Sequence, residues 1–183
     1  MGRRVGVLVS GEGSNLQALL DAGVPVAAVA ANNENARGLR RAARAGVAAS
    51  SFPLDDYPDR EARDTAMADW LESQGVGLVV CAGYMHLLRP CFLDRFPDAV
   101  VNVHPALLPA FPGAHAVEEA LAAGVDETGA TVHLVDEGVD TGRVLRQEAV
   151  PVRPDDTAET LHARIREVEH RLLPEVVREL IER

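Results

Sequence analysis

The sequence predicts an α/β protein built on a single doubly wound, mostly parallel sheet. Apolar runs typical of buried strands alternate with helical patterns along the whole chain. The run at 77–82, Gly-Leu-Val-Val-Cys-Ala, carries no polar alternation, as expected of a central parallel strand. At 183 residues the chain is long enough for one substantial core and short for two, so we expect one domain over residues 1–183.

Each element is expected from its local pattern, in chain order. The expected strands cover residues 5–9, 25–31, 48–52, 77–82, 99–104, 128–135 and 144–152. The last of these is expected to pair with its predecessor at the edge of the sheet. The expected helices cover residues 16–22, 36–45, a stretch that ends near Gln74, 116–123 and 157–182.

Two helices carry further signals. The helix that ends near Gln74 has a predicted apolar stripe of Ala62, Ala66, Met67, Trp70 and Leu71. The last helix is expected to begin with a capping box formed by Asp156 and Glu159, and Pro174 predicts a kink in it. Its apolar stripe is Leu161, Ile165, Val168, Leu172, Val176 and Leu180.

The composition is that of an acidic, soluble protein. The formal net charge of −10 and a sequence pI of about 5.0 argue against a general nucleic-acid surface. Cys81 and Cys91 show neither metal-ligand spacing nor a disulfide framework, and Cys81 is expected to be a buried free thiol. No segment approaches membrane-spanning length, and the first apolar run is too short for a signal peptide. We therefore expect a cytoplasmic protein.

A stretch near the middle of the chain carries the first candidate functional residues. The run 99–104 contains Asn102 and His104, and Pro105 and a loop rich in proline and leucine follow it. Alternate residues of a strand share a face, so both side chains are expected on one side of the sheet. Pro105 cannot continue a strand ladder, which places His104 where the strand stops. Ligands of open α/β sheets bind beyond such ends, although the two residues could also serve only as caps.

A glycine-rich turn follows the first predicted strand. Residues 10–15, Ser-Gly-Glu-Gly-Ser-Asn, lead into a helix, an arrangement that aims backbone N–H groups at an anion. The dinucleotide fingerprint needs a third glycine where the chain has Leu16, and an acidic residue where it has Asn33. A single phosphate is therefore a better expected ligand than NAD. The alternative is a plain turn with a polar helix cap.

These residue types favour acyl transfer to an amine. The Asn102 amide can donate to a carbonyl oxygen as it becomes an oxyanion. A histidine kept protonated by a carboxylate can donate to that oxygen or to the leaving nitrogen. Asp136 and Asp140, in an acidic loop at 136–142, are both candidates for the carboxylate. The six histidines include no pair spaced for metal binding on one helix, so metal catalysis is not expected.

Five blocks of the sequence together resemble one enzyme family. They are SGEGSNLQAL at 10–19, GYMHLL at 83–88, VNVHPALLPAFPG at 101–113, TVHLVDEGVDTG at 131–142, and Glu169-His170. On these blocks the chain resembles the 10-formyltetrahydrofolate-dependent formyltransferases, in order and over nearly its whole length. The resemblance implies the Rossmann-like fold of that family.

The resemblance also implies roles for individual residues. It implies that Asn102, His104 and Asp140 form the catalytic set. A second set is implied to bind the phosphate and ribosyl part of the substrate: Gly13, Ser14, Asn15 and Glu169. The residues implied to surround the folate are Arg60, Met85, His86, Leu87, Leu88, Asn102, Asp136, Glu137, Gly138, Val139 and Asp140.

The reaction implied by the resemblance is a one-carbon transfer in de novo purine biosynthesis. A formyl group passes from the co-substrate 10-formyltetrahydrofolate to the amine of phosphoribosylglycinamide, with no metal or redox cofactor. These two small molecules are the expected partners, with no nucleic acid and no membrane. A homodimer is a further expectation, although the chain stops at Arg183, short of the C-terminal extension of many members.

Other functions stay open alongside this one. A formyltetrahydrofolate hydrolase gives the formyl group to water and carries an extra N-terminal domain. A methionyl-tRNA formyltransferase carries a C-terminal nucleic-acid domain, and the −10 charge would repel tRNA. A non-catalytic folate- or nucleotide-binding module would not need Asn102, His104 and Asp140 together. The chain departs from the family pattern at three positions, which hold His86, Ala110 and Arg143.

Overall fold

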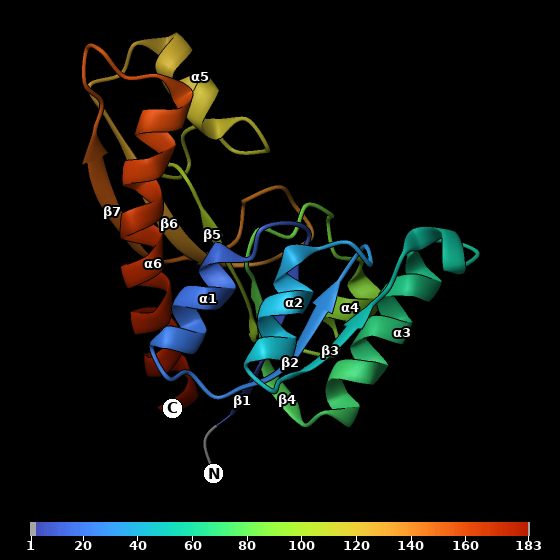
Figure 1. Cartoon of the computed structure of the whole chain (residues 1–183). Helices are drawn as coiled ribbons and strands as arrows, with labels where there is room; N and C mark the ends of the chain where they lie inside the picture. The colour runs from blue at the N-terminus through green and yellow to red at the C-terminus, as the bar shows by residue number, and fades with distance from the viewer. Residues whose placement is uncertain (1–2, 183) are drawn as a thin grey trace.

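A single seven-stranded sheet forms the centre of the protein, in a computed structural model that describes residues 3–182 (Figure 1). The strands lie side by side in the order β3-β2-β1-β4-β5-β6-β7. Their bounds are β1 Arg4–Val9, β2 Val26–Ala31, β3 Ala48–Ser51, β4 Val76–Cys81, β5 Val100–His104, β6 Glu127–Leu134 and β7 Val144–Pro151. Strands β1 to β5 are parallel, whereas β6 and β7 run antiparallel to their neighbours. The predicted doubly wound, mostly parallel sheet is confirmed, and positions 1, 2 and 183 of the predicted domain lie outside the described residues.

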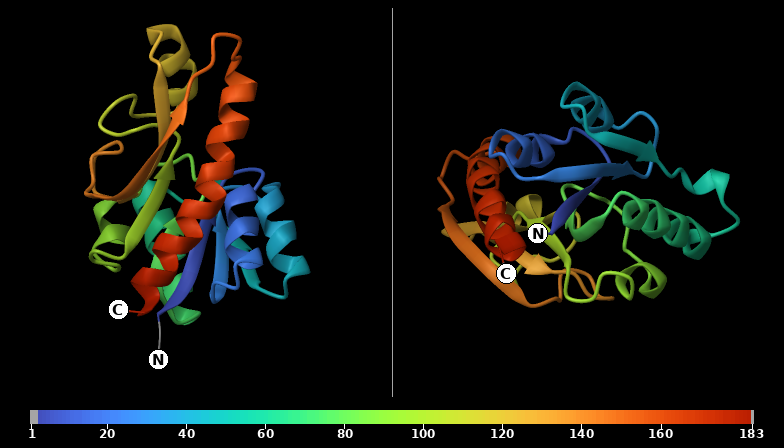
Figure 2. Two further views of the ribbon diagram at one scale, coloured as in Figure 1. Left: turned by 90° about the vertical axis from the view of Figure 1, so that its left-hand side faces the viewer. Right: turned by 90° about the horizontal axis from the view of Figure 1, so that it is seen from below.

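Helices cover both faces of the sheet (Figure 2). Their bounds are α1 Ser14–Asp21, α2 Arg37–Arg44, α3 Arg60–Ser73, α4 Pro90–Leu93, α5 Ala116–Ala123 and α6 Ala158–Glu182. The chain moves outward from β1 to β3 and then returns to β4. Right-handed crossovers therefore place α1 and α2 on one face and α3 and α4 on the other. The long α6 packs against α1, β6 and β7, on the same face as α1.

The covered sheet explains the apolar runs of the sequence. Strand β1 is buried from Val5 onward and β4 is buried from Leu78 onward, because helices lie on both sides of these strands. Cys81 is a buried free thiol, as predicted, and burial raises its pKa to about 12. A thiol with that pKa is inert at neutral pH.

The predicted apolar stripe of α3 is only partly right. Met67 and Leu71 are fully buried, but so are the charged residues Arg63 and Asp64. These two side chains pair with each other, and Arg63 Nη1 and Asp64 Oδ2 contact the segment that follows β4. Charged groups are buried only when they are paired and hydrogen-bonded, so an apolar pattern alone could not reveal them.

The predicted capping box at the start of α6 is wrong by one residue. The backbone N–H of Thr160 donates to Thr157 Oγ1 over 3.2 Å, and the N–H of Thr157 donates to Thr160 Oγ1 over 2.9 Å. Asp156 instead accepts hydrogen bonds from the Arg153 N–H and from the Arg164 guanidinium. The helix begins at Ala158, so Thr157 is the residue that caps it. α6 continues through Pro174, where the kink stays a prediction.

We expect Thr157→Ala to lower the free energy of unfolding by about 1 kcal/mol, the usual cost of losing a helix cap. The control is Glu159→Ala, which changes an exposed residue in the same turn and should have an effect within about 0.5 kcal/mol. Urea unfolding followed by circular dichroism measures both values. An equal loss in the two variants would show that Thr157 is not the cap.

Candidate active site

Three loops meet at the carboxyl edge of the parallel strands. They follow β1, β4 and β5, which are neighbours in the sheet (Figure 1). The loops after β1 and β4 touch, because the Ser10 N–H donates to Gly83 O over 3.2 Å and the Met85 N–H donates to Ser10 Oγ over 2.9 Å. The crossovers that leave β1 and β4 pass to opposite faces, which opens the crevice where α/β sheets bind ligands.

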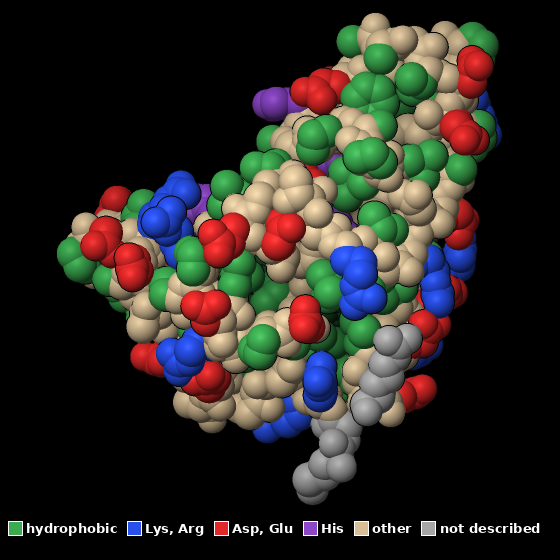
Figure 3. Space-filling model, turned by 180° about the vertical axis from the view of Figure 1, so that it is seen from behind, with side chains coloured by type: hydrophobic (Ala, Val, Ile, Leu, Met, Phe, Trp, Pro, Cys, Tyr) green, Lys and Arg blue, Asp and Glu red, His purple; other side chains and the backbone are tan. Residues whose placement is uncertain are grey.

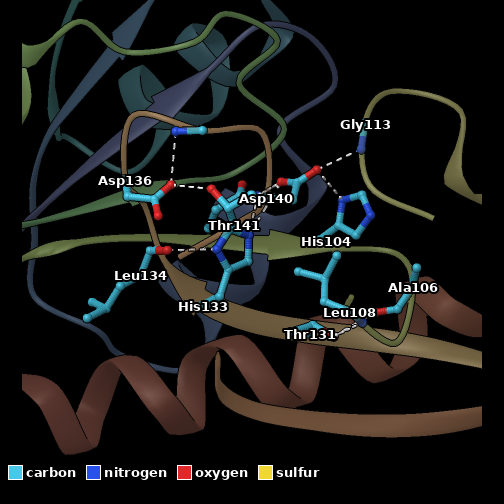
Figure 4. Close-up of polar contacts among 12 residues, drawn as sticks. His104, Ala106, Leu108, Gly113, Thr131, His133, Leu134, Asp136, Asp140 and Thr141 are labelled. Atoms are coloured by element: carbon cyan, nitrogen blue, oxygen red, sulfur yellow. Dashed lines mark hydrogen bonds and ion pairs between the residues drawn. The ribbon is translucent and has the colours of Figure 1, made fainter. Parts of the chain in front are cut away.

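Asn102 and His104 lie at the end of β5 and project to the same side, as the strand spacing predicted. Both contact the carboxylate of Asp140, which lies in the loop between β6 and β7. His104 Nδ1 lies 3.3 Å from Asp140 Oδ2, and Asn102 Nδ2 lies 3.5 Å from Asp140 Oδ1. Figure 4 shows the imidazole of His104 beside this carboxylate. Of the two carboxylates that the sequence left open, Asp140 is the one that contacts His104.

Small residues and the carboxylate of Asp136 determine the shape of the acidic loop at 136–142. Asp136 accepts hydrogen bonds from the Gly138 N–H over 3.0 Å and from Thr141 Oγ1 over 2.6 Å, so it closes its own loop (Figure 4). Gly142 passes so close to β6 that a Cβ there would lie 1.7 Å from Leu134 O. Asp140 itself has a positive φ of 54°, a conformation that Asp adopts more readily than most residues.

The Asp140 carboxylate is held in its ionised form. Burial alone would raise its pKa, but three other influences outweigh burial: the contact with His133, the hydrogen bond from the Gly113 N–H, and the charge of a protonated His104. The net effect lowers the pKa of Asp140 below its usual value. The Gly113 N–H donates to Oδ2 over 2.8 Å, so the loop after β5 and the acidic loop meet on this carboxylate.

His104 has hydrogen-bond acceptors at both ring nitrogens. Nδ1 faces Asp140, and Nε2 lies 2.7 Å from the carbonyl oxygen of Phe111. A carboxylate and a carbonyl can only accept, so the imidazole satisfies both when each nitrogen carries a proton. The His104 side chain is 5% exposed, so both ring nitrogens face hydrogen-bond acceptors inside the protein.

Two residues of β6 complete this group and were not predicted. His133 Nδ1 donates to Leu134 O over 2.8 Å, and its Nε2 lies 3.2 Å from Asn102 Nδ2 and 3.5 Å from Asp140 Oδ1. Thr131 Oγ1 donates to Ala106 O and accepts from the Leu108 N–H, so it holds the turn that follows His104 (Figure 4). Thr131 and His133 alternate along a predicted strand, which was a signal that they share a face. The pairing of His133 with Asn102 depends on an antiparallel register that the sequence does not display.

The glycine-rich turn forms a second polar group beside α6. Gly13 caps α1 with a φ of 73°, and a Cβ there would lie 2.8 Å from Gly38 Cα. Asn15 Nδ2 donates to Glu169 Oε2 over 3.1 Å, so the structure joins two predicted residues 154 positions apart. Burial raises the pKa of Glu169, against the Asn15 hydrogen bond, which lowers it. Ser14 lines an adjoining pocket of about 500 Å³, together with Arg41 and His170.

The residues predicted around a folate lie on three segments. Met85 and Leu87 are exposed, with 67% and 49% of their surface accessible, whereas Leu88 is buried. Arg60 is exposed at the start of α3, and His86 is half-buried. In the acidic loop, Asp136 and Glu137 are exposed, Gly138 is half-buried and Val139 is 45% exposed. Among residues 3–182 no hydrogen bond joins the segment 83–88 to the acidic loop.

The surface carries charges of both signs. On the face drawn in Figure 3, acidic and basic side chains are interspersed, and hydrophobic side chains gather toward the upper lobe. Within the described part of the chain, no group of three or more His, Cys, Asp or Glu side chains is placed to hold a metal ion. None of the helices there is long and apolar enough to cross a membrane.

Comparisons with known proteins agree with one another. A family model described as formyl transferase matches residues 3–177. A phosphoribosylglycinamide formyltransferase of Mycobacterium tuberculosis is 50% identical over 174 residues, which cover 93% of this chain and 81% of that protein. A phosphoribosylglycinamide formyltransferase of Haemophilus influenzae is 39% identical over 96% of this chain and 86% of its own length. The crystal structure of glycinamide ribonucleotide transformylase 1 from Symbiobacterium toebii matches with a TM-score of 0.96 at 48% identity, covering 99% of this chain and 88% of that one.

The lowered pKa of Asp140 predicts how stability depends on pH. The pKa of Asp140 in the folded state lies below its value of about 4 in the unfolded state. The carboxylate therefore stabilises the fold fully above pH ~4, and this stabilisation is lost as the pH falls through the folded-state pKa. Asp140→Asn should therefore cost at least about 1 kcal/mol of unfolding free energy at pH 6, and the gap to the parent protein should narrow toward pH 3. Urea unfolding across this range measures the gap. A difference in unfolding free energy between the two proteins that stays constant down to pH 3 would contradict a lowered pKa of Asp140.

Proposed function

The chain belongs to the formyl transferase family, and from that premise we propose that it transfers a formyl group to the amine of phosphoribosylglycinamide, a step of de novo purine biosynthesis. The formyl donor is 10-formyltetrahydrofolate, which serves as a co-substrate, and the transfer uses no metal. The observation that carries the proposal is that His104 and Asn102, at the end of β5, both contact the half-buried carboxylate of Asp140 in the loop between β6 and β7.

Asn102, His104 and Asp140 are the proposed catalytic residues. The amine nitrogen of the acceptor attacks the formyl carbon, and a tetrahedral adduct forms whose oxygen carries negative charge. The bond from that carbon to N10 of the folate then breaks, and the proton lost by the amine ends on N10. Asn102 Nδ2 and protonated His104 donate to the adduct oxygen, which lowers the barrier because these hydrogen bonds stabilise the negative charge that develops there. Asp140 favours the protonated imidazole by its negative charge.

The loop after β5 must shift for His104 to act on a substrate. Nε2 donates to the Phe111 carbonyl in this structure, so that donor reaches a substrate oxygen only after Phe111 withdraws. The Gly113 N–H of the same loop donates to Asp140, and the contact of Asp140 with His104 Nδ1 does not involve Phe111. We therefore expect Phe111 to move on substrate binding while the ion pair of His104 and Asp140 persists.

The glycine-rich turn and Glu169 are the proposed site for the phosphoribosyl part of the acceptor. Gly13, Ser14 and Asn15 lie at the N-terminus of α1, where unpaired backbone N–H groups favour a phosphate. Glu169 is buried against Asn15, and its carboxylate can accept hydrogen bonds from ribose hydroxyls. The pocket lined by Ser14, Arg41 and His170 supplies room beside this turn.

The folate is proposed to lie between the segment after β4 and the acidic loop. Met85 and Leu87 present exposed apolar surface to it, and Arg60 provides a positive charge at the start of α3. Residues 136–140 contribute the opposite wall, with Asn102 and Asp140 at the end where the formyl group is transferred.

Other expectations stay predictions of this proposal. We propose that residues 1–183 act as a single formyltransferase domain located in the cytoplasm. A homodimer also stays a prediction, and sedimentation equilibrium of the purified protein would check it. The expected partners remain the two small-molecule substrates.

The purified protein mixed with 10-formyltetrahydrofolate, with and without phosphoribosylglycinamide, tests the function. We expect loss of the formyl group only when the glycinamide is present. Loss without the glycinamide would make water the acceptor and would identify a hydrolase. Binding of the folate with no turnover under either condition would identify a binding module.

We expect Asn102→Ala, His104→Ala and Asp140→Asn each to lower kcat by about 100-fold or more, the usual effect of losing an oxyanion donor or a general acid. Steady-state kinetics with saturating substrates measures the loss. The matched control is Asp94→Asn, which changes an exposed carboxylate outside the site and should leave kcat within about twofold. A near-normal kcat in any of the three site variants would remove that residue from the catalytic set.

We expect Glu169→Gln to raise the KM for phosphoribosylglycinamide about tenfold, because an amide replaces the carboxylate that accepts from the acceptor's hydroxyls. The glutamine keeps an oxygen for the Asn15 hydrogen bond, so the fold should be preserved. The KM for 10-formyltetrahydrofolate serves as the internal control and should stay unchanged. A rise in the KM for 10-formyltetrahydrofolate alone would show that Glu169 acts on the formyl donor and not on the acceptor.

A further inference from the structure

We propose that a buried ion pair on α3, Arg63 with Asp64, positions the segment after β4 and is a positioning element for the formyl-donor site. The inference rests on the proposed function for the identity of the donor. Both side chains have no exposed surface, and Arg63 Nε lies 2.6 Å from Asp64 Oδ1. The pair lies outside the group formed by Asn102, His104 and Asp140.

Stability alone does not account for burying these two charges. The desolvation of a buried ion pair often cancels its mutual attraction, and apolar residues of similar size are frequently as stable. In the described part of the chain, Arg63 Nη2 is also buried without a hydrogen-bond partner, which adds to the cost. A costly buried pair that reaches toward one loop points to a role in holding that loop.

Each member of the pair holds a different point of the segment 83–89. Asp64 Oδ2 accepts a hydrogen bond from the backbone N–H of Arg89 over 2.9 Å. Arg63 Nη1 lies 3.2 Å from His86 Nδ1, and a guanidinium can only donate, so Nδ1 accepts. The two contacts fix the middle and the end of the segment from beneath, while its beginning is tied to Ser10 through the Met85 N–H.

His86 is the neutral link between α3 and the segment. Burial lowers its pKa first, and the positive charges of Arg63 and Arg60 lower it further. The charge of Asp64 raises the pKa of His86, and the other ring nitrogen, Nε2, lies 3.2 Å from Asn32 Nδ2. The ring also packs edge-on against Tyr84, with centroids 5.8 Å apart. A neutral imidazole can accept from the Arg63 guanidinium, as this geometry requires.

The fixed backbone leaves two apolar side chains facing outward. Met85 and Leu87 alternate with the inward-facing His86 and Leu88 and are the two most exposed large hydrophobic side chains of the described residues. A loop that presents apolar groups on a preformed backbone binds a ligand without first having to become ordered.

The test uses the double variant Arg63→Met with Asp64→Leu, which removes both charges and keeps apolar volume in the core. We expect amide hydrogen exchange at Arg89 to become at least about tenfold faster. We also expect the KM for 10-formyltetrahydrofolate to rise about tenfold, the size of one lost charge-assisted hydrogen bond. The KM for phosphoribosylglycinamide and kcat should stay within about twofold, since neither the catalytic group nor the glycine-rich turn touches the pair.

Arg95→Gln is the matched control. Arg95 forms exposed ion pairs with Asp69 and Glu72, which lie on α3 like Arg63 and Asp64. It should change neither exchange at Arg89 nor either KM. His86→Ala is a second test variant. It keeps Arg63 paired with Asp64 and opens the position of the His86 ring to water. It should speed exchange across the segment and raise the KM of the donor in the same direction as the double variant.

The outcomes separate this inference from the proposed function. Unchanged exchange at Arg89 in the double variant overturns the positioning role, as does an equal rise in the KM of both substrates, which indicates general damage. Faster exchange with an unchanged donor KM overturns the link to the donor site. Absence of turnover in the parent protein would instead overturn the proposed function, and the exchange of Arg89 would still decide whether the pair holds the segment.

Discussion

One carboxylate, that of Asp140, holds the candidate active site together. Its Oδ2 takes the Gly113 N–H and faces His104, and its Oδ1 faces Asn102 and His133. These donors come from β5, the loop after it and β6, so three parts of the chain depend on a single charged group. A carboxylate with only 14% of its side chain exposed needs such donors to remain ionised. Without it, His104 loses the group that favours a proton on both nitrogens, and the loop after β5 loses an anchor.

The fold places this carboxylate by backbone geometry. The parallel strand β5 ends at His104 because Pro105 follows, while the antiparallel β6 brings His133 opposite Asn102. The acidic loop then returns against the end of β6, where only glycine fits at position 142. A second constraint of the same kind lies across the crevice, where the buried pair of Arg63 and Asp64 ties the segment after β4 to α3. Both walls of the crevice are therefore positioned by charged side chains with little or no exposed surface.

Local signals predicted the seven strands and, among the described residues, every α-helix except the short α4, and they failed where contacts are distant. The Asn102-x-His104-Pro105 pattern located the end of β5 and the shared face, because strand alternation is a local property. Spacing alone could not separate Asp136 from Asp140, since the choice depends on how a seven-residue loop turns back, and only the family resemblance indicated Asp140. His133 was missed because its partner is set by strand register, and Arg63 because a helical pattern counts apolar residues only. The first turn of α6 was misplaced by one residue because Asp156 and Thr157 are both good caps.

The claim that His104 and Asp140 act as one unit is tested most directly by a double-mutant cycle. The measurement is kcat for His104→Ala, for Asp140→Asn and for the combined variant, with 10-formyltetrahydrofolate and phosphoribosylglycinamide saturating. If the carboxylate acts by favouring the protonated imidazole, the combined variant should be about as slow as the slower single variant, because either change removes the same function. Losses that multiply in the combined variant would show that the two residues act independently and would contradict the account.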